Sequence, residues 1–326
     1  MDKQDLYRYT GIPDQLYGIR SMRLMEGAAS GCRLIEAVTA GGLHADFLPD
    51  TGLDIGLVRY KGKNVSFLSK NGYDSPVNFS ARDGEFKHTF SAGLLYTCGL
   101  RSAGPPSTDG QEYHPLHGRI HGKQATGVGA YTEDDNLVIV GTLRETSLFG
   151  HALELKRRIT LPVWGSSIIV EDTIENLTPR PEEFMIMYHY NFGYPLLSEK
   201  ARLVLPDDRA TTPRTEHAKT GSGRECEFVC PIDGEDEMVY NHLLSDGYAR
   251  LENQDAGIAV TMRWGLDSLP ILIQWKSMAS GDYVLGIEPS NSYIMGRAAE
   301  RENGTLQTLD AFGKVSTRVE LAFESF

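Results

Sequence analysis

Short alternating segments separated by turn residues recur along the 326-residue chain, and this pattern is the strongest constraint on its fold. Examples are LVIVGTLRET (137–146), LELKRRITLP (153–162), SSIIVEDTIENLT (166–178) and ARLVLPDD (201–208). Alternating or β-branched runs bounded by Gly, Pro, Asn and Asp are typical of antiparallel strands. Helix signals are scarce, so the sequence predicts an all-β fold.

Turn residues also predict individual hairpins. LVRYKGKNVSFLS (57–69) turns at Gly62, and YARLENQDAGIAVTMRW (248–264) turns around Asp255 and Gly257. Several hairpins in series build a large sandwich. Because composition does not shift along the chain, we predict one β-sandwich domain over 1–326, with 1–40 as an N-terminal extension packed on it. The stretch SAGPPSTDG (102–110) is predicted to be a long irregular loop, and such loops are often functional.

Charge and cysteine content exclude several classes of protein. The formal net charge of −12 disfavours binding to nucleic acid or an anionic membrane, since both need a basic surface. The N-terminus lacks an apolar leader and no stretch approaches the ~20 apolar residues of a membrane helix, so we expect a cytoplasmic protein. Four scattered cysteines form neither a disulfide framework nor a common zinc motif.

The segment FMIMYHYNFGYP (184–195) ends a run of large apolar residues on a histidine and an asparagine. Alternate residues of a strand share a face, which groups Met185, Met187, His189 and Asn191 on one side. Gly193 and Pro195 follow, so we expect His189 and Asn191 near a rim of the sheet. Taken alone, His189 is either a buried histidine with a backbone partner or a catalytic group on a rigid strand.

A second strand, in DYVLGIEPSN (282–291), ends on a carboxylate. Glu288 shares its face with Gly286, which leaves space for a ligand. Burying a carboxylate is costly, so its position indicates a purpose. The alternative is that Glu288 faces solvent or pairs with Arg297 or Arg301.

The segment EYHPLHGRIHGK (112–123) carries three histidines, His114, His117 and His121. Its Pro and Gly residues make a helix improbable, and only Glu112 could complete a metal site. His117 and Arg119 fit a sugar- or phosphate-binding loop better, because both side chains donate hydrogen bonds to oxygen. A metal site at the three histidines is therefore only weakly supported, and none is assigned. We found no dinucleotide fingerprint, P-loop or G-x-S-x-G motif, and we expect no cofactor.

With HGRI, YHYNFGYP and GIEPSN in this order in an all-β chain, the sequence resembles the aldose 1-epimerase (mutarotase) superfamily of galactose mutarotase-like proteins. More closely, it is similar to a bacterial branch of unknown function. The resemblance runs from about Gly41 to the end. It implies a large antiparallel β-supersandwich and the interconversion of the α and β anomers of a free aldose.

The resemblance also implies roles for three residues. His189 matches the general acid at the ring oxygen, Glu288 the general base at the C1 hydroxyl, and His117 the histidine that supports the ring oxygen or a hydroxyl. Related hexose-phosphate mutarotases carry an Arg beyond an H-G motif, but Arg119 lies one residue closer, which puts a sugar phosphate in doubt. The expected substrate-binding residues are Arg119, Asn191, Arg101, Gln274 and Trp275.

This chemistry needs a proton removed from O1 and one delivered to the ring oxygen. At neutral pH, Glu288 should be ionised and His189 readily protonated, and a close pairing would favour both. The expected partner is a monosaccharide. The alternatives are a non-catalytic carbohydrate-binding protein and a sugar epimerase or lyase on the same fold. The identity of the sugar and the oligomeric state do not follow from the sequence.

Overall fold

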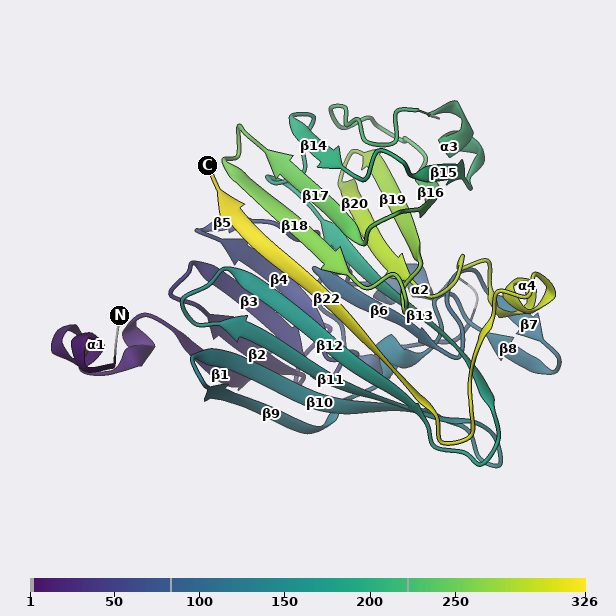
Figure 1. Ribbon diagram of the computed structural model, residues 1–326, viewed down its shortest axis with the longest axis horizontal. Coiled ribbons are helices and arrows are strands. Elements are labelled where there is room, and N and C mark those ends of the chain that lie inside the picture. Colours follow the sequence, from purple (N-terminus) through teal and green to yellow (C-terminus); the bar gives the residue numbers. More distant parts are fainter. Residues whose placement is uncertain (1–2, 83, 222) are drawn as a thin grey trace.

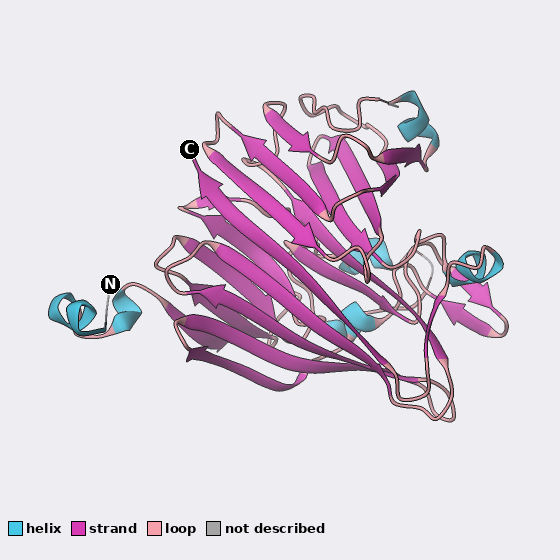
Figure 2. Cartoon of the chain, viewed as in Figure 1, coloured by secondary structure: helices cyan, strands magenta, loops and turns pink. Residues whose placement is uncertain are grey.

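The computed structural model describes residues 3–82, 84–221 and 223–326. Within these residues, two antiparallel sheets of 12 and 8 strands lie face to face, with short helices at the periphery (Figures 1 and 2). This is the large all-β sandwich that the strand pattern predicted. Among the same residues, no helix has the length and apolar content needed to span a bilayer.

The larger sheet has the order β1-β2-β3-β4-β6-β13-β20-β19-β16-β15, with β5 paired to β4 and β21 to β13. Its strands are β1 (Gly18–Arg23), β2 (Arg33–Val38), β3 (Leu43–Leu48), β4 (Asp54–Tyr60), β5 (Lys63–Asn64), β6 (Leu95–Leu100), β13 (Glu182–Phe192), β15 (Ala210–Pro213), β16 (Met238–Leu243), β19 (Ile271–Ala279), β20 (Asp282–Ser290) and β21 (Gln307–Leu309). Two of these strands, β1 and β2, fall within 1–40, the region predicted to be an extension. That the chain forms one domain stays a prediction.

The smaller sheet has the order β14-β17-β18-β22-β12-β11-β10-β9. Its strands are β9 (Thr126–Glu133), β10 (Asn136–Thr146), β11 (Ala152–Pro162), β12 (Ser167–Asn176), β14 (Ala201–Val204), β17 (Tyr248–Asn253), β18 (Ile258–Trp264) and β22 (Lys314–Ser325). The strands predicted at 137–146, 153–162 and 166–178 and the two hairpins are confirmed. The fourth predicted strand, at 201–208, is observed only over its first half, because β14 spans Ala201–Val204.

The remaining elements are short. The helices are α1 (Lys3–Tyr9), α2 (Phe86–Thr89), α3 (Glu216–Thr220) and α4 (Arg297–Glu302), with 3₁₀ turns η1 (Pro13–Gln15), η2 (Pro76–Asn78) and η3 (Ile120–Gly122). A two-stranded ribbon joins β7 (Ser107–Asp109) to β8 (Glu112–His114). The prediction of an irregular loop over 102–110 is therefore wrong for residues 107–109, which form β7. Gly110, with a positive φ of 64°, makes the turn that lets β7 pair with β8.

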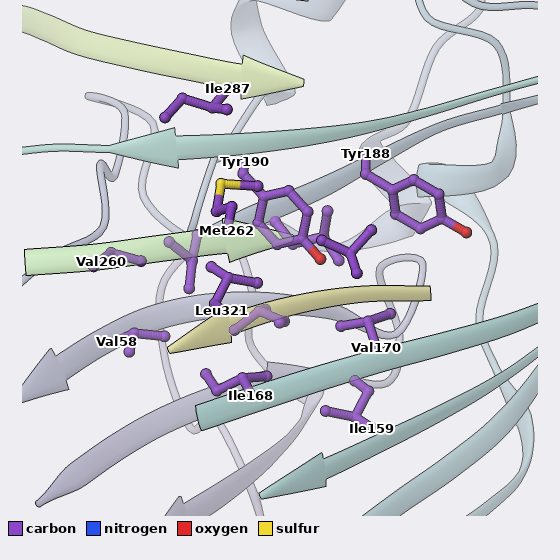
Figure 3. Packing of buried hydrophobic residues seen from close by; sticks show 14 of the residues in the cluster. Val58, Ile159, Ile168, Val170, Tyr188, Tyr190, Val260, Met262, Ile287 and Leu321 are labelled. Carbon is purple, nitrogen blue, oxygen red and sulfur yellow. The ribbon is translucent and has the colours of Figure 1, made fainter. Parts of the chain in front are cut away.

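The main core fills the space between the two sheets. Strand alternation sends one face of β13 into this core. There Tyr188 and Tyr190 lie among aliphatic side chains of the smaller sheet, which include Ile159, Val170 and Leu321 (Figure 3). The opposite face of β13 carries Met185 and Met187, which belong to a separate apolar cluster on the outer side of the larger sheet. The predicted division of the strand into two faces is thus confirmed.

A buried ion-pair network crosses the core. Arg157 of β11 binds Asp172 of β12 at 2.7 Å and Asp54 of β4 at 3.0 Å, which joins the two sheets. Arg157 also donates to Thr97 Oγ1 at 3.0 Å, and Tyr188 donates to Asp172 at 2.7 Å. Burial raises the pKa of Asp54, and the Arg157 charge opposes this shift. Because every charge has an opposite partner, the network avoids the large cost of an unpaired buried ion.

Substitution of Arg157 should therefore destabilise the fold strongly. Arg157→Met leaves two buried carboxylates uncompensated, so we expect the free energy of unfolding in urea to fall by about 3–5 kcal/mol. Arg158→Met, on the same strand, breaks an exposed pair with Glu133 and should cost less than about 1 kcal/mol. Equal losses in the two variants would contradict the role given to the network.

Candidate active site

His189 and Glu288 lie side by side on β13 and β20. The strands pair with Asn191 opposite Gly286 and Tyr190 opposite Ile287, a register that brings His189 level with Glu288. His189 Nε2 lies 3.3 Å from Glu288 Oε1. The two residues are only 5% and 2% exposed. β13 ends at Phe192, so His189 and Asn191 lie near the end of the strand, as Gly193 and Pro195 indicated, but the strand is central in the larger sheet and both side chains are buried.

Gly286 makes room for the carboxyl group of Glu288. A Cβ at position 286 would lie 2.1 Å from Glu288 Oε1 and 2.9 Å from the Cβ of Trp275. The space predicted at Gly286 exists, but the carboxyl of Glu288 itself fills it. Arg297 and Arg301, the alternative partners of Glu288, bind Asp109 and Glu183 instead.

Aromatic rings surround this pair. Trp275 of β19 lies 5.3 Å from the His189 ring, and its Nε1 donates to Glu237 at 2.7 Å. Phe90, which follows α2, lies 5.8 Å from His189 and 6.3 Å from Trp275. Phe86 of α2 stacks on Phe90 at 4.9 Å. The partly buried ring of Phe90 therefore contacts His189 directly, and Phe86 packs behind it.

His117 joins the site from the loop after β8. It has a left-handed backbone, with φ of 59°, and its ring centre lies 5.7 Å from that of His189. Both His117 and His121 contact the ring of Phe86, whereas His114 lies near Glu112, at 3.8 Å. Among the described residues, no three or more His, Cys, Asp or Glu side chains are arranged to hold a metal ion.

Asn191 supports the backbone at the site. Its Nδ2 donates to the carbonyl oxygens of His189 at 2.9 Å and Gly93 at 3.1 Å. It is fully buried, so its position is beneath the site surface. The neighbouring Asn191 side chain also partly offsets the effect of burial on the pKa of His189.

Burial favours the neutral forms of both central groups. It lowers the pKa of His189 to about 3, with a smaller contribution from His117. It raises the pKa of Glu288 well above its usual value, against the charge of Arg214. These shifts run against the expectation of an ionised Glu288 beside a protonated His189. In the forms that burial favours, the contact of 3.3 Å joins a carboxylic acid to a neutral imidazole.

Arg214 is a residue of the site that the sequence did not reveal. It follows β15, and its Nη2 donates to the carbonyl oxygen of Ile294 at 3.4 Å. Its charge acts on both Glu288 and His117. It stands in PRTEH, between β15 and α3, a segment without a recognisable motif, so no pattern signalled it.

Three predicted substrate-binding residues have their contacts elsewhere. Arg101 binds Glu112 and Glu182, and Arg119 donates to the carbonyl oxygen of Tyr113. Gln274 Oε1 accepts a hydrogen bond from His242 Nε2 at 2.9 Å, on the opposite face of β19 from Trp275, within the sandwich. The structure thus brings together His117, His189, Asn191, Trp275 and Glu288. It gives Arg101, Arg119 and Gln274 no contact with His189 or Glu288 among the described residues.

A hollow of about 680 Å³ lies away from these groups, on the smaller sheet. Its lining includes Lys156, Arg158 and Arg318. Lys156 pairs with Glu154 at 3.0 Å and Arg158 pairs with Glu133, so these charges are already matched. Because it lacks a cluster of unpaired buried groups, we place the candidate site at His189 and Glu288 instead.

The charge state of His189 can be measured directly. Because burial lowers its pKa to about 3, the imidazole should remain neutral from pH 8 down to about pH 4.5. The ¹⁵N and ¹³C signals of the ring, assigned by their loss in His189→Asn, report this in a pH titration. Protonation with a midpoint near 6.5, as for a free imidazole, would contradict it.

Comparison with solved structures gives the fold. A candidate aldose 1-epimerase from Klebsiella pneumoniae is 22% identical with a TM-score of 0.88, covering 95% of this chain and 85% of that one. A galactose mutarotase-like protein from Clostridium acetobutylicum is 16% identical with a TM-score of 0.69, over 96% of this chain and 100% of that one. For galactose 1-epimerase from Lactobacillus acidophilus the values are 15%, 0.63, 95% and 99%. The chain therefore has the galactose mutarotase-like fold.

Comparison with curated proteins found no match. A family model described as a domain of unknown function, DUF4432, matches residues 29–323. This range contains both strands of the site and the loop that carries His117. The chain belongs to the DUF4432 family, which shares the galactose mutarotase-like fold in this member.

Proposed function

We propose that this protein is an aldose 1-epimerase that interconverts the α and β anomers of a free sugar. The observation that carries the proposal is the buried His189–Glu288 pair at 3.3 Å. An acid and a base on one rigid sheet face can serve two oxygen atoms bonded to the same carbon, as O1 and the ring oxygen are. The similar structures include proteins named for this reaction, which supports the proposal.

Unpaired polar atoms in the site support a hydroxylated ligand. Within the described residues, Nδ1 of His117, Nδ1 of His189 and Oε1 of Glu288 are buried and have no hydrogen-bond partner. The last of these atoms lies 3.3 Å from His189 Nε2, but this contact lacks the geometry of a hydrogen bond. Such atoms are costly unless a ligand or water satisfies them. Trp275 and Phe90 add aromatic surface for the C–H face of a sugar ring.

The proposed ring opening moves one proton at each end. Glu288, as carboxylate, takes the proton of the O1 hydroxyl while His189, as imidazolium, gives a proton to the ring oxygen, and the C1–O5 bond breaks. The open aldehyde rotates about C1–C2. Reclosure reverses both transfers and forms the other anomer. At every stage the pair carries one proton in total, on His189 before ring opening and on Glu288 after it. The reaction therefore needs no cofactor and no net exchange of protons with solvent.

The neutral pair that burial favours is the same protonation state that ring opening leaves behind. Glu288 then carries the proton taken from O1, and His189 has lost the one given to O5. The cyclic sugar needs the charged arrangement of the pair. Arg214 favours it by stabilising the Glu288 carboxylate, and sugar hydroxyls in place of an apolar environment would add to this effect.

Glu288→Gln should abolish anomer exchange while leaving the shape of the site intact. We expect a loss on the order of 10² to 10⁴-fold, the usual contribution of a positioned base. Saturation-transfer NMR measures exchange, and calorimetry measures sugar binding, which should persist. Glu225→Gln is a matched control, since Glu225 is also buried but pairs with Arg209 at 3.0 Å. Full activity of Glu288→Gln would remove Glu288 from the mechanism.

The pH dependence follows from the single shared proton. Activity should fall when the pair gains a second proton, near the His189 pKa of about 3, or loses its only proton above the raised pKa of Glu288. We therefore expect kcat/KM to be maintained down to about pH 4.5 on the acid side and to fall on the alkaline side when Glu288 loses its proton. An acid limb centred near pH 6.5, the ordinary value for histidine, would contradict this account.

A further inference from the structure

Glu145 is the penultimate residue of β10, in the smaller sheet, and its side chain is buried. Its carboxylate nevertheless binds backbone N–H groups at the end of β6, in the larger sheet. Glu145 Oε2 accepts hydrogen bonds from Leu100 N at 2.6 Å and from Arg101 N at 3.3 Å. The residue is only 2% exposed. A side chain of one sheet thus fixes the last residues of β6, a strand of the other.

The end of β6 in turn holds the loop that carries His117. Gly99 N donates to the carbonyl oxygen of His117 at 3.1 Å, and Arg119 N donates to the carbonyl oxygen of Gly99 at 3.0 Å. A Cβ on Gly118 would lie 2.4 Å from Gly99 O and 2.3 Å from Ser102 O. Only glycine therefore fits at 118, and the loop lies directly against the backbone that Glu145 anchors.

The His117 ring has little else to fix it in place. Its Nδ1 is buried without a hydrogen-bond partner among the described residues, and its ring contacts are with Phe86 at 5.3 Å and His189 at 5.7 Å. Its orientation follows from its left-handed backbone, with φ of 59°, and from the bonds that hold this backbone. A shift at the end of β6 would therefore displace the ring relative to His189.

A carboxylate suits this anchor better than a neutral side chain. It accepts both N–H groups with one charged oxygen, and such bonds are stronger than neutral ones. Burial raises the pKa of Glu145, and the hydrogen bonds from Leu100 N and Arg101 N oppose this shift, with smaller contributions from the charges of Arg119 and Arg101. Without Glu145, the N–H groups of Leu100 and Arg101 would be left unpaired in a buried position.

We propose that Glu145 is a positioning residue that sets the place of His117 in the site from the opposite sheet. As a role in catalysis this rests on the proposed epimerase function. The bonds run from Glu145 to the backbone of residues 100 and 101, from neighbouring Gly99 to residues 117 and 119, and so to the His117 ring.

A double-mutant cycle tests the proposal. Glu145→Gln keeps the shape of the side chain but removes its charge, and we expect kcat/KM for anomer exchange to fall on the order of 10 to 100-fold, as for small displacements of a catalytic group. In a His117→Ala background the same change should have almost no further effect. The proposal would be overturned if the losses of the two single variants multiplied in the double variant, or if Glu145→Gln kept full activity.

Glu154→Gln provides the matched control. Glu154 is a buried carboxylate on neighbouring β11, 4% exposed, but its partners are the side chains of Arg144 and Lys156. We expect this variant to keep wild-type exchange in both backgrounds. A loss equal to that of Glu145→Gln would show a general effect on the fold and would overturn the proposal.

A second measurement separates this proposal from the proposed function. In sugar-free protein, Glu145→Gln should shift the NMR signals of the His117 imidazole, and Glu154→Gln should not. If wild-type protein exchanged no aldose but the shift occurred, the epimerase function would fail while the positioning of the ring stood. Unchanged His117 signals in Glu145→Gln would overturn the positioning itself.

Discussion

Arg157 and its two carboxylate partners join the sheets from inside the core, and the site depends on that junction. Asp172 belongs to the smaller sheet and Asp54 to the larger one, so the guanidinium fixes one sheet against the other. Tyr188 donates to Asp172 from β13, one residue before His189. Because successive side chains of a strand face opposite ways, the interaction that holds Tyr188 inside also holds His189 outside.

The chemistry of the site follows from its burial. His189 and Glu288 share a face of the larger sheet, where Phe90 and Trp275 contact the His189 ring and Phe86 stacks on Phe90. Low polarity around the pair favours its neutral form, in which the proton rests on Glu288. Such a pair can pass a proton between two sugar oxygens without gaining or losing charge overall, which is what anomer interconversion requires.

The sequence predicted the parts of the fold that strand alternation controls. It assigned His189 and Asn191 to one face of β13 and the tyrosines to the other, because a period of two leaves no other arrangement. Alternation also explains why Gln274 lies inside the sandwich: it is next to Trp275 in β19, so the two cannot share a face. The contacts of Arg214, Arg101 and Arg119 could not be predicted from the sequence, because these residues stand in or beside loops. There, side-chain direction depends on contacts distant in sequence. The raised pKa of Glu288 likewise could not be predicted, because it depends on burial by segments that are distant in the sequence.

The central claim is that the His189–Glu288 pair catalyses anomer exchange of a free aldose. The most direct measurement is saturation-transfer NMR on the unmodified protein with a panel of hexoses, pentoses and deoxy sugars. The account predicts that for at least one aldose the exchange rate rises in proportion to protein concentration above the spontaneous rate. Sugar binding without faster exchange for any member of the panel would contradict it and would instead support a carbohydrate-binding protein.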